Sequence, residues 1–130
     1  MPDTDALHGR AFTTDAPFTQ SVRLSISEVT KFLVEVLGRS IVQHLAGISD
    51  PQAVRDWIGG TRQPRTTTEQ RLRTAYRVFQ IINLADTEYT ARAWFIGLNP
   101  QLGDEAPATA IREDRLRDVI VAAEGFARTS

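Results

Sequence analysis

The 130-residue chain contains no cysteine and only two histidines, His8 and His44. Without cysteine there are no disulfides and no thiolate metal sites. The two histidines have no ligand-like spacing, and no histidine is placed to activate a serine or threonine. Phosphate loops, dinucleotide glycine fingerprints and His–carboxylate metal motifs are also missing. We therefore expect a protein that is not an enzyme and that uses no cofactor and no metal.

Long apolar runs are missing too. Apolar residues make up 42% of the chain, which is enough for a core. No run approaches the roughly 18 residues that a membrane span needs, and the first residues have no apolar signal-peptide core. The sequence therefore predicts a cytoplasmic protein without a membrane partner.

The net charge is only −1, but the charges are unevenly distributed. Residues 50–80 contain six arginines and three acids, a net charge of +3, whereas residues 81–130 contain eight acids and five arginines, a net charge of −3. A basic segment favours contact with nucleic-acid phosphates, although a solvated arginine-rich helix face has the same composition. The acidic segment is compatible with a separate partner that is not DNA.

Hydrophobic periodicity predicts an all-α fold. Residues 1–22 are polar and lack periodicity, and we expect them to form a flexible tail. Helices are expected over residues 25–37, 39–46, 50–58, 66–84, 86–97 and 114–127, with a short turn at residues 108–112. We assign residues 23–84 to one helical domain and residues 85–130 to a second, smaller one.

Local capping signals define several of these helices. Ser25 with Glu28, and Thr66 with Glu69, match capping boxes. Asp86 is expected to cap the helix over residues 86–97. The inward-facing residues of that helix are predicted to be Tyr89, Ala93 and Trp94, and Leu98 and Leu102 are expected to pack beneath the loop that follows.

Residues 46–65, AGISDPQAVRDWIGGTRQPR, are the segment around which the chain is organised. Asp50 is a good N-cap, Pro51 suits the first helical position and Gly59-Gly60 ends the helix. Its apolar stripe is Val54, Trp57 and Ile58, which leaves Gln52 and Arg55 on the opposite face. Together with residues 39–46 and the turn Gly47-Ile48-Ser49, this pattern predicts a helix-turn-helix with an anchored back and a polar front.

This pattern predicts residue roles in DNA binding. Gln52 and Arg55 are expected to reach base edges in the major groove. The residues expected to contact phosphates are Arg39, Gln43, Arg62 and Arg65. Two packed surface helices joined by a glycine turn would give the same sequence without binding DNA. Because one short helix binds an operator weakly, a homodimer on a two-fold site is expected.

The sequence resembles the Xre–MbcA–ParS family of antitoxins from about residue 27 to residue 127. The first piece is the helix-turn-helix run with Val54, Trp57, Gly60 and Pro64, and the second is Arg71-Leu72 followed by Ala75-Tyr76. The third and most specific piece is Ala91-Arg92-Ala93-Trp94 leading to Leu98-Asn99-Pro100, Leu102-Gly103 and Pro107, then Glu124-Gly125-Phe126-Ala127. Family members carry a Leu-Leu pair after the proline, where this chain has Ala108, Ala110 and Ile111.

The resemblance implies an antitoxin whose N-terminal half binds operator DNA and autoregulates, and whose C-terminal half neutralises a RES-domain toxin that consumes NAD. By the matched motif it implies that the toxin-binding domain is shaped by Trp94, Asn99, Leu102, Gly103 and Pro107, and that Gly125 and Phe126 approach the toxin. Because arginine and aromatic side chains dominate interface hot spots, we predict exposed toxin contacts at Arg112, Arg115, Phe126 and Arg128.

Two other functions fit the same residues. The chain could be a stand-alone helix-turn-helix repressor, of phage type, whose C-terminal helices serve dimerisation. It could also be a protein-interaction module that has lost DNA binding, because Asp50 and Asp56 flank the polar helix face.

Overall fold

The computed structural model describes residues 16–129, apart from the side chains of residues 20–23, and this part of the chain is all-α as predicted. No β-strand occurs within residues 16–129; an isolated bridge joins Asn99 to Glu105. The elements are α2 (Ala16–Arg23), α3 (Ile26–Leu37), α4 (Arg39–Ala46), α5 (Pro51–Gly59), α6 (Thr66–Ala85), α7 (Glu88–Ile96), the 3-10 helix η2 (Pro100–Leu102), α8 (Pro107–Arg112) and α9 (Leu116–Thr129).

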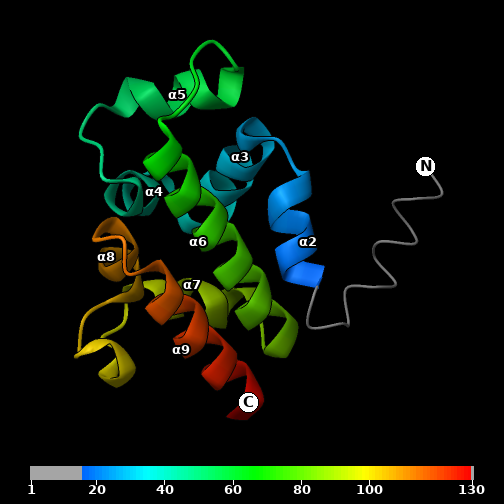
Figure 1. Ribbon diagram of the computed structural model, residues 1–130, viewed down its shortest axis with the longest axis vertical. Coiled ribbons are helices and arrows are strands. Elements are labelled where there is room, and N and C mark those ends of the chain that lie inside the picture. The colour runs from blue at the N-terminus through cyan, green and yellow to red at the C-terminus, as the bar shows by residue number, and fades with distance from the viewer. Residues whose placement is uncertain (1–15, 130) are drawn as a thin grey trace, which may run out of the picture.

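The long helix α6 runs through the middle of the molecule (Figure 1). Its 20 residues span about 30 Å. It packs against α2, α3, α4, α7, α8 and α9. Helix α5 packs against α3 and α4 at one end of the molecule, while the C-terminal end of α9 lies at the other (Figure 1).

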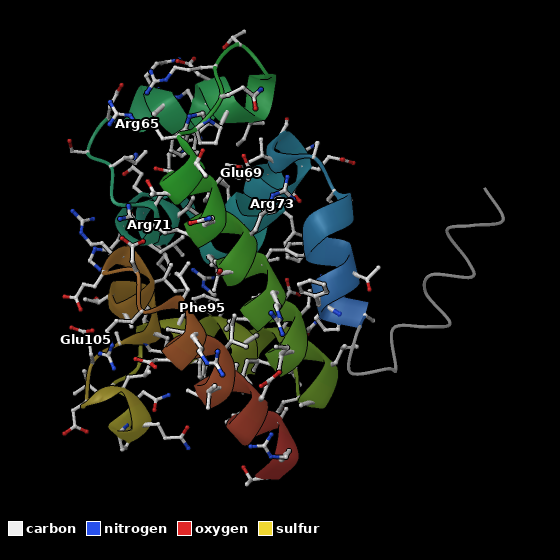
Figure 2. All side chains as sticks on the ribbon, viewed as in Figure 1. Arg65, Glu69, Arg71, Arg73, Phe95 and Glu105 are labelled. Carbon is white, nitrogen blue, oxygen red and sulfur yellow. The ribbon has the colours of Figure 1, made fainter. Side chains whose placement is uncertain are left out.

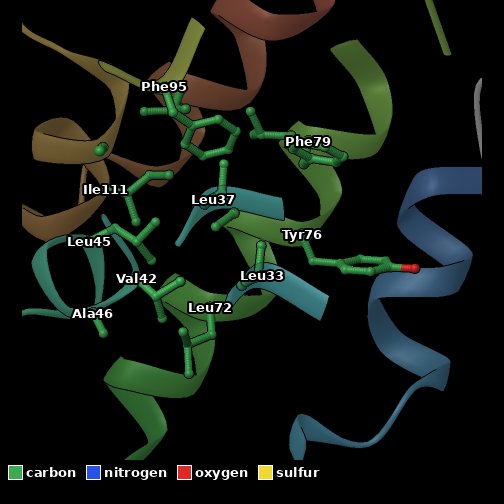
Figure 3. Packing of buried hydrophobic residues seen from close by; sticks show 14 of the residues in the cluster. Leu33, Leu37, Val42, Leu45, Ala46, Leu72, Tyr76, Phe79, Phe95 and Ile111 are labelled. Carbon is green, nitrogen blue, oxygen red and sulfur yellow. The ribbon is translucent and has the colours of Figure 1, made fainter. Parts of the chain in front are cut away.

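A single hydrophobic cluster joins these helices. Figure 3 shows part of it, where fully buried side chains of α3, α4, α6, α7 and α8 pack together: Leu33, Leu37, Val42, Leu45, Leu72, Phe79, Phe95 and Ile111. The ring of Phe32 packs edge-on against Tyr76 and Phe79, with centroid distances of 5.1 and 5.5 Å. The core therefore extends across the predicted domain boundary at residues 84 and 85, and that boundary stays a prediction.

The N-terminal prediction is wrong for residues 16–22, which belong to helix α2 instead of a flexible tail. Helix α2 packs against α6, and the guanidinium carbon of Arg77 lies 5.1 Å from the centre of the Phe18 ring. This cation–π contact and the packing on α6 come from a distant part of the chain, so the local sequence carried little signal. Residues 1–15, including His8, lie outside the described residues.

The predicted inner face of α7 is also wrong. Ala91 and Phe95 are fully buried, whereas Tyr89 is 83% exposed and Ala93 is exposed; only Trp94 of the predicted face is half-buried. The ring of Phe95 lies 6.4 Å from that of Phe79, so packing against α6 decides which side of α7 faces inward. Leu98 is likewise 76% exposed instead of tucked beneath its loop, whereas Leu102 is buried as predicted.

Two predicted caps differ from the structure. The N-cap of α6 is Arg65 instead of Thr66, and its side chain, which only donates, makes no cap hydrogen bond. The carboxylate of Glu69 accepts from Nε of Arg73 at 2.8 Å (Figure 2). The N-cap of α7 is Thr87 instead of Asp86, and its hydroxyl accepts the N–H of Thr90. The capping box of Ser25 and Glu28 is present as predicted.

Candidate functional site

Helix α5 begins and ends where the local sequence predicts. The carboxylate of Asp50 accepts the N–H of Gln52 at 3.0 Å, and Pro51 occupies the first turn. Gly60 ends the helix in the left-handed conformation with φ of 78°. Val54 and Trp57 are buried, so one side of this nine-residue helix is fixed to the core.

The opposite side of α5 carries the side chains predicted to reach bases. Gln52 and Arg55 are both exposed. The amide Nε2 of Gln52 donates to the carboxylate of Asp56 at 2.9 Å, and Nη1 of Arg55 donates to the amide oxygen of Gln52 at 3.0 Å. The structure therefore brings Gln52 and Arg55 together and adds Asp56, which the sequence analysis did not count as a site residue.

The predicted phosphate contacts lie on three elements around α5. Arg62, in the loop after α5, lies between two carboxylates, with its Nη1 at 3.6 Å from Asp56 and 3.9 Å from Asp50. Arg39 at the start of α4 and Arg65 before α6 are exposed, whereas Gln43 is half-buried. Exposure permits the predicted contacts of the arginines, and Arg62, with its side chain 51% exposed, would reach a phosphate from a position beside two carboxylates.

The C-terminal motif forms a compact loop around η2. The side chain of Asn99 caps η2 by accepting the N–H of Gln101 at 2.9 Å, and Pro107 begins α8. Leu102 is 1% exposed and its side chain fills the core where η2 packs against α9. Its role in shaping a toxin-binding domain stays a prediction. The residues of α8 that follow Pro107 and are fully or nearly fully buried are Ala108, Ala110 and Ile111.

Two of the predicted contact arginines have partners within the chain. Nη1 of Arg112 donates to the backbone oxygen of His44 at 2.9 Å, although Arg112 is otherwise exposed. Arg115 is half-buried, and its guanidinium donates to the backbone oxygen of Leu102 and the carboxylate of Glu105, both at 3.2 Å. The guanidinium of Arg115 thus holds the η2 loop next to the start of α9, its side chain is 36% exposed, and its contact with a toxin stays a prediction.

The end of α9 keeps the other predicted contacts at the surface. Arg128 is exposed, and Phe126 is half-buried at the edge of the core. A methyl group added at Gly125 would lie 3.6 Å from the side chain of Gln101, so this part of α9 runs close to η2. Trp94 is half-buried and packs edge-on against Phe95 at 6.0 Å, which leaves only part of its ring available to a partner.

A junction that the sequence analysis missed joins the two halves of the chain. Arg71 of α6 donates to the backbone oxygen of Ala46 at 2.9 Å and to both carboxylate oxygens of Asp114 at 2.8 and 2.9 Å. Figure 2 shows Arg71 beside α4 and α8. The hydrogen bond from Arg71 lowers the pKa of Asp114, and Asp114 itself has φ of 64°. Because 43 residues separate Arg71 from Asp114, no local pattern could have indicated this pair.

The pKa of the neighbouring Glu113 is shifted in the opposite direction from that of Asp114. A hydrogen bond between the Glu113 and Glu105 side chains, with some desolvation, raises the pKa of Glu113. At the other side of the junction, Nε2 of His44 lies 2.8 Å from the hydroxyl of Thr109, in hydrogen-bond contact. Two acids of this region form ion pairs with arginines: Asp114 with Arg71 and Glu105 with Arg115.

No family model, curated protein or solved structure matches this chain. Across residues 16–129, no helix is both long enough and apolar enough to cross a membrane. Within the same residues, no three His, Asp or Glu side chains are grouped in a way that could hold a metal ion. Helix α5 and the surface formed by η2 and the C-terminal end of α9 are the two candidate functional surfaces.

Proposed function

We propose that the chain is the antitoxin of a type II toxin–antitoxin system. In this proposal α4 and α5 form an Xre-like helix-turn-helix that binds operator DNA and represses the operon. The C-terminal helices bind and neutralise a RES-domain toxin that consumes NAD. The chain itself performs no catalysis and holds no cofactor.

The observation that carries the DNA-binding half is the division of α5 into two sides. Val54 and Trp57 fix one side in the core, while Gln52 and Arg55 extend from the other. A helix with one buried side and one exposed polar side can place its polar side chains in the major groove while its apolar side chains stay packed in the core. Arg62, Arg65, Arg39 and Gln43 are proposed to contact phosphates, and two copies of the chain are proposed to occupy a two-fold operator.

The toxin-binding half rests on the resemblance of residues 91–127 to the antitoxin family. The Asn99 cap, the buried Leu102 and the Pro107 start of α8 form an ordered support next to α9. At the end of α9, Phe126 and Arg128 offer an aromatic and a cationic side chain to a partner. We propose this end, with the exposed part of Trp94, as the toxin contact.

The test is a rescue of toxicity in a host cell. The gene adjacent to the one for this chain is expressed alone and together with this chain, and growth and NAD level are followed. We expect growth arrest and NAD loss that the chain reverses, and reduced rescue by Phe126→Ala with Arg128→Ala. A harmless neighbour, or toxicity that this chain does not relieve, would contradict the antitoxin proposal.

A stand-alone repressor is the second candidate, and the outer face of α7 favours it. Tyr89, Ala93 and Ile96 recur at helical spacing on this face, and Tyr89 and Ile96 are 83% and 58% exposed. Exposed apolar stripes of this kind mark contacts with other proteins. If the chain binds an operator as a dimer that Tyr89→Asp dissociates, and no toxin is found, the repressor function would be preferred.

A further inference from the structure

We infer that Gln52 recognises an adenine in the major groove and that Asp56 is the positioning residue that sets this preference. The inference rests on the proposed DNA-binding function and specifies the base that α5 reads. Its evidence is the hydrogen-bonded row Asp56–Gln52–Arg55 on the exposed side of α5.

The orientation of the Gln52 amide is fixed by two neighbours of opposite chemistry. The Asp56 carboxylate only accepts, and its Oδ1 lies 2.9 Å from the amide nitrogen. Arg55 only donates, and its Nη1 lies 3.0 Å from the amide oxygen. Rotating the amide by a half-turn would place oxygen against carboxylate and N–H against guanidinium, so this row permits one orientation.

The fixed amide retains the groups that adenine needs. A primary amide has two N–H donors and two acceptor sites on its oxygen. Asp56 uses one donor and Arg55 uses one acceptor site, which leaves one of each for a base. Adenine offers N7 as an acceptor and N6–H as a donor side by side in the major groove, whereas guanine offers two acceptors there. The free edge of Gln52 therefore matches adenine and not guanine.

Asp56 is itself held in place. Its side chain is only 25% exposed, and Nη1 of Arg62 lies 3.6 Å from its second oxygen. The backbone oxygen of Asp56 also accepts the N–H of Thr61 at 3.0 Å, which anchors the loop that carries Arg62. A carboxylate near the DNA lowers affinity for every phosphate backbone. We infer that this loss of general affinity accompanies the gain in base selectivity.

The experiment selects binding sites from a pool of randomised DNA duplexes with the purified full chain and sequences the enriched DNA. We expect one position in each half-site to prefer adenine by about tenfold or more. Gln52→Ala should abolish this preference. Asp56→Ala should reduce it to about twofold or less while tightening binding to unselected duplexes, since a negative charge is removed.

Two variants separate the hydrogen bond from the charge. Asp56→Asn removes the charge, but its amide oxygen still accepts from Gln52, so adenine preference should be kept while binding to unselected duplexes tightens. Glu35→Gln removes one exposed charge from α3 and should leave base preference unchanged. Thermal unfolding of each variant confirms that it is folded, and a structural role of Asp56 alone would not move a base preference.

The outcomes separate DNA binding by the chain from adenine recognition by Gln52. If the unaltered chain enriches no sequence, both the DNA-binding function and this inference are wrong. If it enriches a site whose base preferences survive Gln52→Ala, DNA binding stands and the adenine inference is overturned. If Gln52→Ala removes the adenine preference but Asp56→Ala does not, the role of Asp56 is overturned.

Discussion

Gly47 and Gly60 end α4 and α5 in the same left-handed backbone conformation, with φ of 77° and 78°. Alanine at either position should therefore meet the same backbone strain, about 1–2 kcal/mol for an L-residue in this region. A methyl group at Gly60 would have no atom within 4 Å. We expect Gly60→Ala to lower the free energy of unfolding by the strain alone.

Gly47 differs because Arg71 lies against it. An added Cβ would lie 2.5 Å from Nη1 of Arg71, the nitrogen that donates to the backbone oxygen of Ala46 at 2.9 Å. The guanidinium must move, which weakens a charge-assisted hydrogen bond of about 1.5–3 kcal/mol. Because Arg71 keeps part of its pair with Asp114, we expect the displacement of the guanidinium to cost about 1–2 kcal/mol of stability in addition to the backbone strain. Gly47→Ala should therefore cost about 2–4 kcal/mol in all.

The assay is urea unfolding followed by circular dichroism, with the midpoint compared at unchanged slope. Both glycine variants are also made in an Arg71→Ala background, which forms a double-mutant cycle. In that background the guanidinium is absent, so Gly47→Ala and Gly60→Ala should destabilise by equal amounts. The reasoning is refuted if the two glycine variants cost the same in the unaltered chain, or if Arg71→Ala leaves their difference unchanged.

Three further predictions concern the junction, the core and the DNA contacts. The pKa of Asp114 is lowered by Arg71, so the stability from this pair is present above the unfolded pKa of about 3.9 and lost as pH falls through the lower folded value. Asparagine tolerates the positive φ at this position, so Asp114→Asn should lower the free energy of unfolding at neutral pH and leave it equal to that of the unaltered chain in strong acid. A difference in unfolding free energy that does not change with pH would contradict this. Phe95→Ala should cost about 3–5 kcal/mol and Tyr89→Ala less than about 0.5 kcal/mol, measured by urea unfolding; equal costs would restore the predicted face of α7. Arg62→Ala should weaken binding to all duplexes alike and lower the slope of log affinity against log salt by about one, and a change at single base pairs only would rule out a phosphate contact.

Local chemistry was enough to predict α5. Asp50, Pro51 and Gly60 act within a few bonds of the backbone that they shape, so their effect is visible in sequence. The same holds for the Ser25 capping box of α3. At Thr66 the same motif does not form a capping box, because the N-cap is Arg65, one residue earlier than predicted, and Glu69 pairs with Arg73.

The face of α7 could not be predicted for a different reason. Its sequence, EYTARAWFI, has aromatic or aliphatic side chains around most of the helix, so periodicity does not define one inner side. Phe95 is the residue that packs against Phe79 of α6 in the interior, and this contact forms only when the helices of the core are assembled. The exposure of Gln52 and Arg55 was predictable because they lie opposite a clear apolar stripe, whereas the hydrogen bond from Gln52 to Asp56 depends on side-chain orientations that spacing does not specify.

The junction at the end of α4 connects the two halves that sequence alone separates. The last carbonyls of a helix have no partner within it and need donors from elsewhere. Here Arg71 of α6 supplies one for Ala46 and Arg112 of α8 supplies one for His44, 25 and 68 residues away in sequence. The turn between α4 and α5 is thus held by side chains from outside it. Any partner that displaces Arg112 from His44 would remove one support of that turn, which gives the C-terminal surface a direct physical connection to the proposed DNA-binding helix.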